Sequence, residues 1–106
     1  MPYYVYVIRL RSEVLTKKKK FAKANPGHIR YKPCVYVGQS GNTPEVRYQK
    51  HLTAKSGSKL VKEFHVSLHK KLTEKQPIFE TREESIAHEF ALTERLRKKG
   101  YAAWCR

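Results

Sequence analysis

Residues 34–53, CVYVGQSGNTPEVRYQKHLT, hold the most complete succession of secondary-structure signals in this chain. The first five of them, 34–38, are rich in Val and Tyr, which favour strands. The next four, QSGN, are typical of a turn. Thr43 is a preferred N-cap residue and Pro44 suits the first helical position, so we expect a helix from there to about Leu52. The stretch therefore predicts a strand, a turn and a helix in that order.

A second run of strand-forming residues lies upstream, at 3–10, with the sequence YYVYVIRL. A long connection joins it to 34–38, which permits an antiparallel pairing of the two strands. This connection, 11–33, is polar and very basic and contains an Asn-Pro-Gly turn signal, so it is predicted to be a loop. Its lysine run fits a solvated loop and a phosphate-contacting arm equally well. The run consists of Lys17, Lys18, Lys19 and Lys20.

The segment after the first predicted helix contains shorter signals. Ser-Gly-Ser at 56–58 breaks the pattern, and residues 59–64, KLVKEF, predict a short amphipathic helix. Residues 65–69, HVSLH, alternate polar and apolar side chains, which indicates a third strand. Residues 70–80 are polar and contain a proline, so we expect a loop.

Thr81 and Glu84 form a capping box at the start of the longest predicted helix, which runs to about Lys99 and stops at Gly100. The following residues, 101–104, are either a last strand or a docking tail. The side chains expected near one face of the helix are Ile86, Phe90, Thr93 and Leu96 or Arg97.

Strands and helices are mixed here without strict alternation, which predicts an α+β fold. We expect a small antiparallel sheet of about three strands, flanked by helices. The 106 residues match the size of one domain, so 1–106 is expected to be a single domain with a basic insertion at 11–33.

The cysteines and the apolar runs predict the environment of the chain. Cys34 and Cys105 show no metal-ligand spacing and are expected to be reduced thiols, although a disulfide remains open. No stretch approaches the ~20 apolar residues that span a membrane. The N-terminus has no pattern of a signal peptide. We therefore expect a cytoplasmic protein that does not bind membranes.

The charge of the chain indicates a polyanionic partner. It contains 23 Lys and Arg residues against 9 Asp and Glu residues, a formal net charge of +14. Contacts to phosphates release counterions and dominate the affinity of basic proteins for nucleic acids. The alternative is a highly soluble basic domain without such a partner. We therefore expect nucleic acid as the partner.

Five polar side chains offer the groups that phosphodiester cleavage needs: a base, a cation for the phosphate and a metal ligand. Tyr6 and Tyr36 stand in the first two predicted strands. Arg47 and His51 are four residues apart and share one face of the first helix. Glu89 stands in the first half of the long helix. Taken singly, the tyrosines would be packing residues, and His51 and Glu89 would lie on solvated surfaces.

The order of these residues resembles the GIY-YIG nuclease family. Tyr4-Val5-Tyr6 resembles its first signature, with Tyr4 in place of glycine, and Tyr36-Val37-Gly38 resembles its second. Arg47 and His51 match the Arg-(three residues)-His pattern of many members. The segment from Glu84 to Glu89 is similar to the one that ends in the family's metal ligand. The resemblance extends from residue 3 to about residue 100.

The resemblance implies one Mg²⁺ (or Mn²⁺) ion held by Glu89. Arg47 would hold the scissile phosphate, Tyr6 would be the general base with Tyr36 in support, and His51 would relay the proton. The implied activity is that of an endonuclease, with DNA repair the favoured role. The further residues expected to contact nucleic acid are Lys17, Lys18, Lys19, Lys20 and Lys50.

Three alternatives remain open at this point. A non-catalytic nucleic-acid-binding domain could retain the same fold, and an RNA-binding protein unrelated to nucleases would share only the charge. Glu84 is the alternative metal ligand, although capping accounts for it. The complete set of five residues favours the nuclease over both other functions. A geometric criterion argues against the unrelated RNA-binding protein: all five side chains should face one concave surface. The oligomeric state and the structure of the substrate stay open.

Overall fold

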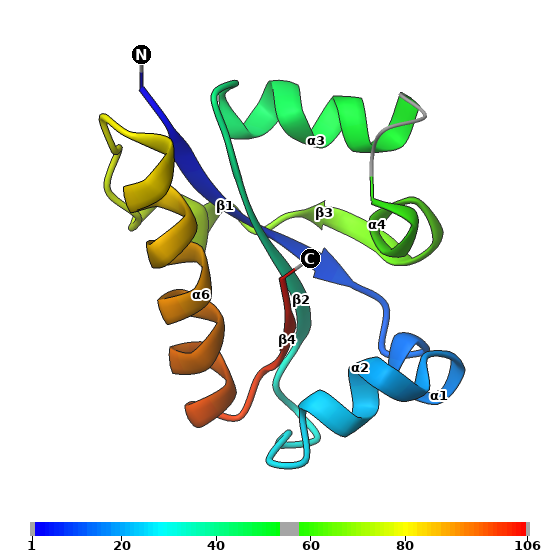
Figure 1. Cartoon of the computed structure of the whole chain (residues 1–106). Helices are drawn as coiled ribbons and strands as arrows, with labels where there is room; N and C mark the ends of the chain where they lie inside the picture. The colour runs from blue at the N-terminus through cyan, green and yellow to red at the C-terminus, as the bar shows by residue number, and fades with distance from the viewer. Residues whose placement is uncertain (1, 54–57, 106) are drawn as a thin grey trace.

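The computed structural model describes residues 2–53 and 58–105, and their fold is α+β, as predicted (Figure 1). The break predicted at 56–58 lies largely outside these residues. The described elements, in chain order, are β1 (Tyr4–Leu10), α1 (Val14–Lys17), α2 (Lys19–Ala24), β2 (Cys34–Ser40), α3 (Pro44–Thr53), α4 (Lys59–Phe64), β3 (His65–Leu68), α5 (Lys70–Glu74), α6 (Arg82–Lys98) and β4 (Ala102–Trp104).

The sheet has four strands in the order β3-β1-β2-β4, and it is mixed rather than antiparallel. β1 pairs antiparallel with β2 and β3, whereas β4 pairs parallel with the start of β2. The prediction of about three antiparallel strands was therefore wrong. The direction of β4 depends on α6, which returns the chain to the start of β2, where Ala102 faces Cys34.

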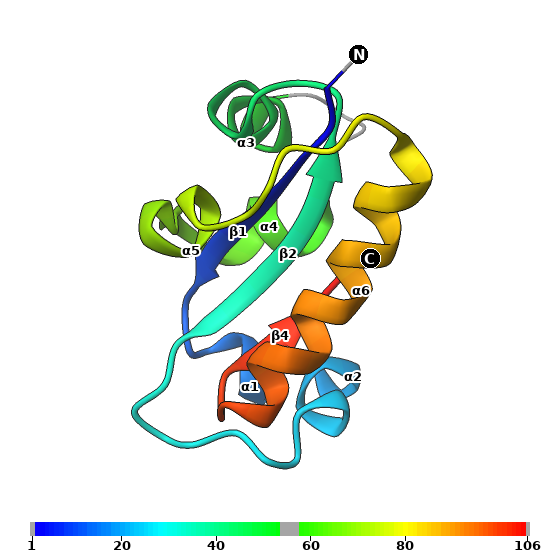
Figure 2. The same ribbon diagram turned by 90° about the vertical axis from the view of Figure 1, so that its left-hand side faces the viewer.

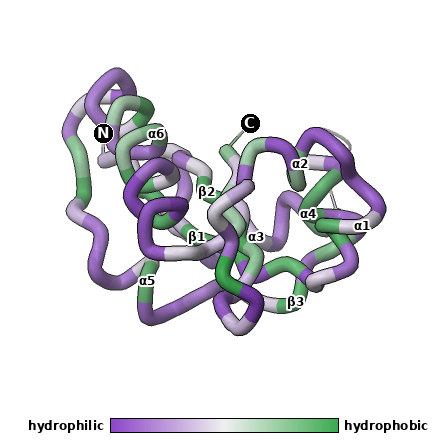
Figure 3. Tube along the Cα trace, turned by 90° about the horizontal axis from the view of Figure 1, so that it is seen from below, coloured by the Kyte–Doolittle hydropathy of each residue, from purple (hydrophilic) through white to green (hydrophobic). Residues whose placement is uncertain are grey.

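Helices cover both faces of the sheet, which explains why β1 and β2 are almost continuously apolar. In Figure 1, α6 lies on one side of the strands and α1 to α4 lie on the other. Tyr6, Ile8 and Leu10 pack against the side of α1, α2 and α4, where Phe21 and Phe64 are buried. Val5, Val7, Val35 and Val37 pack against Leu92 and Leu96 of α6. Figure 3 shows hydrophobic stretches in the central strands and hydrophilic stretches on the outside of the trace.

Segment 11–33 is not simply a loop, because it contains α1 and α2. Val14 and Phe21 are buried in the core. These two apolar residues therefore anchor the short helices on either side of the lysine run. All four lysines of the run are exposed. Lys18 forms an ion pair with Glu63 at 3.3 Å, and its Nζ lies 6.0 Å from the centre of the Phe64 ring.

Asn25 closes the outer edge of β4 with its side chain. Its Nδ2 donates to the carbonyl oxygen of Ala103 at 3.1 Å, and its Oδ1 accepts from the N–H of Ala103 at 2.8 Å. Nδ2 also donates to the carbonyl oxygen of Phe21. The buried amide thus takes the place of a neighbouring strand: it satisfies the N–H of Ala103 and shares the Ala103 carbonyl oxygen with Arg97, which also donates to it.

Segment 70–80 also differs from the predicted loop, because it contains α5. Thr73 of this helix accepts the N–H of Val7 at 3.0 Å, and the N–H of His69 donates to the carbonyl oxygen of Val7 at 2.7 Å. These bonds seal the edge of β1 beyond its pairing with β3. The helix depends on tertiary contacts of this kind, which its polar sequence does not show.

The long helix α6 begins as predicted, with the Thr81 side chain accepting from the N–H of Glu84 at 3.2 Å. It ends before Gly100, which has a φ of 95°. Its buried face differs from the predicted one, because Phe90 is 53% exposed. The buried residues are Ser85, Glu89, Leu92, Thr93 and Leu96. The prediction was right for Thr93 and Leu96 and wrong for Phe90, because polar Ser85 and Glu89 are buried in the first half of α6.

Two further sequence predictions concern the environment of the chain. Cys34 and Cys105 are thiols, as expected. Across residues 2–53 and 58–105, no helix is long and apolar enough to cross a membrane.

Candidate active site

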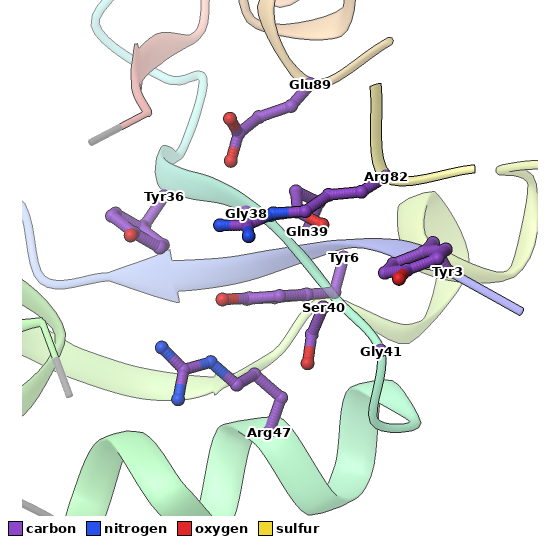
Figure 4. Close-up of a pocket in the computed structure, with 10 residues that line it drawn as sticks. All are labelled: Tyr3, Tyr6, Tyr36, Gly38, Gln39, Ser40, Gly41, Arg47, Arg82 and Glu89. Atoms are coloured by element: carbon purple, nitrogen blue, oxygen red, sulfur yellow. The ribbon is translucent and has the colours of Figure 1, made fainter. Parts of the chain in front are cut away.

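A pocket opens at the end of the sheet where β4 stops. β4 pairs only with Cys34 to Tyr36, so the second half of β2 extends beyond it, between α6 and α3. The pocket there has a volume of about 360 Å³. Figure 4 shows the residues that line it: Tyr3, Tyr6, Tyr36, Gly38, Gln39, Ser40, Gly41, Arg47, Arg82 and Glu89.

Gly38 allows the ring of Tyr6 to lie across β2. The two residues are directly opposed in the β1–β2 pairing. A Cβ atom at position 38 would lie 2.3 Å from Tyr6 Oη and 2.4 Å from Cζ, closer than real Cβ contacts come. Gly38 therefore has a steric reason, since a side chain there would displace Tyr6 from the pocket.

His51 connects Tyr6 to the backbone of Ser58. Tyr6 Oη lies 2.7 Å from His51 Nε2, and the Ser58 N–H donates to His51 Nδ1 at 2.9 Å. Burial, and then the charges of Arg47 and Lys62, lower the pKa of His51 to about 4, so the ring is neutral near pH 7. A backbone N–H can only donate, so Nδ1 carries no proton and the single ring proton is on Nε2.

The tautomer assigned from these bonds makes His51 a donor to the oxygen of Tyr6. With Nδ1 occupied and Nε2 protonated, His51 has no lone pair left to take the Tyr6 proton. This arrangement differs from the relay expected from the sequence. His51 is also 1% exposed rather than on the surface.

The surroundings of Tyr6 determine when it can lose its proton. Burial raises the pKa of Tyr6 well above its ordinary value, and neighbouring Tyr36 and Glu89 raise it further. Arg47 acts in the opposite direction, through its charge and a hydrogen bond. Tyr6 therefore keeps its proton in the free protein at neutral pH. Additional positive charge in the pocket would favour the phenolate.

Tyr36 and His51 are in contact as well, with ring centres 5.6 Å apart and an interplanar angle of 76°. Tyr36 lies on the same face of the sheet as Tyr6, because it is two residues before Gly38 in β2. The two signature tyrosines thus surround the same imidazole, and both line the pocket.

Glu89 supplies the only carboxylate among the residues that line the pocket. It is 1% exposed, against the solvated position that its place in a polar helix suggested. Figure 4 shows its carboxylate and the guanidinium of Arg47 on opposite sides of the pocket, with Tyr6 and Tyr36 between them. Glu84 is exposed and bonded to Thr81, away from the pocket lining, so it is not brought to this site.

The described residues contain no group of three or more His, Cys, Asp or Glu side chains that could hold a metal ion. A single carboxylate fits magnesium nonetheless, because this ion keeps most of its waters and accepts few protein ligands. A water molecule takes about 30 Å³ of liquid volume, so the pocket has space for a hydrated ion beside a phosphate.

Arg82 is a pocket residue that the sequence analysis did not identify. It opens α6, lies seven residues before Glu89, and therefore shares its helix face. Figure 4 shows its guanidinium over β2, within the pocket. Between the two, Ser85 Oγ donates to Gln39 Oε1 at 3.0 Å and holds α6 against β2. The spacing of seven residues between Arg82 and Glu89 was the sequence signal that could have identified Arg82. It predicts a pocket residue only when Glu89 is known to lie on the buried face of α6.

The predicted lysines do not line the pocket. Lys50 is exposed on α3. The run Lys17 to Lys20 lies at the junction of α1 and α2, and these helices lie at the other end of the β1–β2 pair from α3 (Figures 1 and 2). Any contact of this run with nucleic acid would therefore be distant from the pocket.

Comparisons of the chain with protein families, with curated proteins and with solved structures found no match.

Proposed function

We propose that this protein is a metal-dependent endonuclease that hydrolyses phosphodiester bonds in DNA. The observation that carries the proposal is the convergence of Tyr6, Tyr36, Arg47 and Glu89 on one pocket, with His51 bonded to Tyr6. These residues come from β1, β2, α3 and α6. A packing role explains each of them singly, but not their common orientation toward a polar cavity.

Each side chain has a defined task in this proposal. Arg47 binds the scissile phosphate, since its forked donors match phosphate oxygens and its charge offsets the charge of the transition state. Glu89 holds the Mg²⁺ or Mn²⁺ ion, which when bound polarises the phosphate and stabilises the leaving oxygen. Arg82 extends over the same cavity and binds a second phosphate of the strand.

In this scheme Tyr6 loses its own proton to solvent when a bound cation adds positive charge to the pocket, and the resulting phenolate removes the proton of the attacking water. The N–H of His51 stabilises the phenolate by donating to its oxygen, and Arg47 acts in the same direction. Tyr36 restricts the ring of His51 by edge contact and supports Tyr6 from the same side of the pocket. His51 is therefore a positioning residue that acts through Tyr6.

A non-catalytic nucleic-acid-binding domain is the alternative, and Glu89 argues against it. A buried carboxylate repels phosphate and costs free energy to desolvate. A pure binding pocket would gain affinity from its removal. The position of Glu89 opposite Arg47 therefore favours an enzyme that binds a cation between carboxylate and phosphate.

The experiment is cleavage of labelled duplex, branched and single-stranded DNA with Mg²⁺ or Mn²⁺, comparing the wild type with Glu89→Gln. The matched control is Glu45→Gln, which changes an exposed carboxylate on α3. We expect metal-dependent cutting by the wild type and the control. Glu89→Gln should bind DNA at least as well and cut at least a hundredfold more slowly. Binding without cutting by all three proteins would instead identify a binding domain.

A further inference from the structure

A second basic surface lies outside the candidate active site. Two hollows of about 410 and 380 Å³ adjoin each other and share Arg9 in their lining. Neither shares a residue with the pocket around Tyr6. We call this region the Arg9 surface and define it by its six cationic side chains: Arg9, Arg11, Arg30, Lys32, Lys70 and Lys71.

Arg9 occupies an unusual place for a charged residue. It stands in the central strand β1, paired with Val35 on one side and Ser67 on the other. It is the single exposed residue of β1, and a bulge follows it in the pairing with β3. Tyr6 is three residues away in the same strand, so the two side chains point to opposite faces of the sheet. The side chain of Arg9 therefore points away from the hydroxyl of Tyr6.

The charges of the Arg9 surface are poorly compensated. Among the described residues, Glu13 is the only carboxylate that lines either hollow, and it already pairs with Arg11 at 3.9 Å. Arg11 also donates to the carbonyl oxygen of Glu63. Within residues 2–53 and 58–105, no ion pair is formed by the side chains of Arg9, Arg30, Lys70 or Lys71.

The effect of this charge is visible at His69, which lines the second hollow. Burial lowers the pKa of His69 from its ordinary value, and the charges of Arg9 and Lys71 lower it further. Cations held this close repel one another, and an anion in the hollows would remove that repulsion.

We propose that the Arg9 surface binds the sugar–phosphate backbone of a second nucleic-acid segment, separate from the one in the Tyr6 pocket. The three arginines among its cations suit phosphate, because guanidinium groups bind phosphate oxygens with two parallel hydrogen bonds. A backbone can follow adjoining hollows, whereas a flat membrane surface cannot enter them. With two binding surfaces that share no residue, one protein molecule holds two duplexes or two arms of a branched structure.

The first test uses EDTA, so it does not depend on whether the protein cuts. The variant Arg9→Gln/Arg30→Gln/Lys70→Gln/Lys71→Gln is compared with a control of equal charge, Lys23→Gln/Arg95→Gln/Lys98→Gln/Lys99→Gln. The dissociation constant for duplex DNA is measured against salt concentration. Each phosphate contact contributes about 0.9 to the logarithmic slope, so we expect the Arg9 variant to lose roughly 3 units of slope and the control fewer than 1.

The second test measures bridging directly, as energy transfer between a donor-labelled and an acceptor-labelled duplex. The wild type and Glu89→Gln should bring the two together, and the Arg9 variant should not. If replacing Arg9 disturbs β1, then Arg30→Gln/Lys70→Gln/Lys71→Gln, which changes exposed residues only, must still lose most of the transfer.

Equal slopes and equal transfer for the Arg9 variant and its control would overturn the proposal. The proposal would also be overturned if the Arg9 variant bound DNA like the wild type but no longer bound phosphatidylserine vesicles that the wild type binds. That result would identify a membrane contact. Absence of cleavage by the wild type together with bridging that depends on Arg9 would reject the nuclease and retain the second surface.

Discussion

The hydroxyl oxygen of Tyr6 lies 2.7 Å from Nε2 of His51, although the two residues are 45 positions apart in the sequence. The bond has a direction, because the N–H of Ser58 occupies Nδ1 and leaves the proton on Nε2. His51 therefore supports Tyr6 as a hydrogen-bond donor. This role differs from that of a base, and substitution distinguishes the two.

Replacing His51 with Gln should preserve most of the activity, because the Gln side-chain amide N–H can donate to Tyr6 as Nε2 does. His51→Phe retains the volume and removes the donor. A hydrogen bond to a charged oxygen contributes about 1.5–3 kcal/mol, so we expect the rate with Phe to fall roughly a hundredfold. With Gln the fall should be tenfold or less. Single-turnover cleavage rates check this, and equal losses in both variants would instead show that His51 transfers a proton.

Acid should destabilise the protein through His51. Its pKa is about 4 in the folded chain, against 6.5 for the unperturbed group. Above pH 6.5 neither state binds the proton and the full stability is present. Between pH 6.5 and 4 only the unfolded chain binds it, so the free energy of unfolding falls by up to roughly 3 kcal/mol. Urea unfolding at pH 7.5 and 4.5 should show a smaller difference for His51→Gln than for the wild type.

Gly38→Ala should damage both the fold and the site. The added Cβ would meet Tyr6 Oη at 2.3 Å, so the ring or strand β2 must move. Overpacking of this kind costs about 1–3 kcal/mol, and the displaced hydroxyl should lower cleavage at least tenfold. Gly27→Ala is the control, since nothing lies within 4 Å of a Cβ there. Unchanged activity in folded Gly38→Ala would contradict the assigned position of Tyr6.

Arg82→Ala should weaken substrate binding more than it slows the chemical step. In the proposed function, Arg82 holds a phosphate adjacent to the scissile one, and that contact is the same before and in the transition state. We expect KM to rise roughly tenfold, with kcat within threefold. Arg95→Ala changes another exposed arginine of α6 and should leave both constants unchanged. A fall in kcat at constant KM would place Arg82 at the reacting phosphate instead.

Asn25→Ala should destabilise the protein without changing the chemistry of the pocket. The substitution removes both bonds to Ala103 and leaves its buried N–H unsatisfied, whereas its carbonyl oxygen keeps the two bonds that Arg97 donates. We expect a loss of roughly 2 kcal/mol in the free energy of unfolding, measured with urea. Asn42→Ala changes an exposed residue, so the free energy of unfolding should fall by about 0.5 kcal/mol or less, as for a typical surface substitution. Cleavage per folded molecule should be the same in both variants.

The sequence by itself determined the local elements with strong signals. The strands near 3–10 and 34–38, the helix after Thr43 and the capped start of α6 were all predicted, because strand propensity, capping and turn residues act over a few neighbours. The short helices α1, α2 and α5 were not predicted. Their polar sequences give no periodic signal, and tertiary contacts stabilise them.

Only the tertiary structure decided which side chains share the pocket and how they bond. All five predicted residues gather at the end of the sheet, but the sequence did not show that Glu89 and His51 are buried. It also missed Arg82 and the direction of the bond between His51 and Tyr6. Both depend on long-range packing: α6 turns a polar face inward, and Ser58 approaches His51 from the following segment. Local sequence determines whether a segment is a helix or a strand. The packing of these elements against one another determines which side chains meet, and therefore their hydrogen-bond partners and their protonation states.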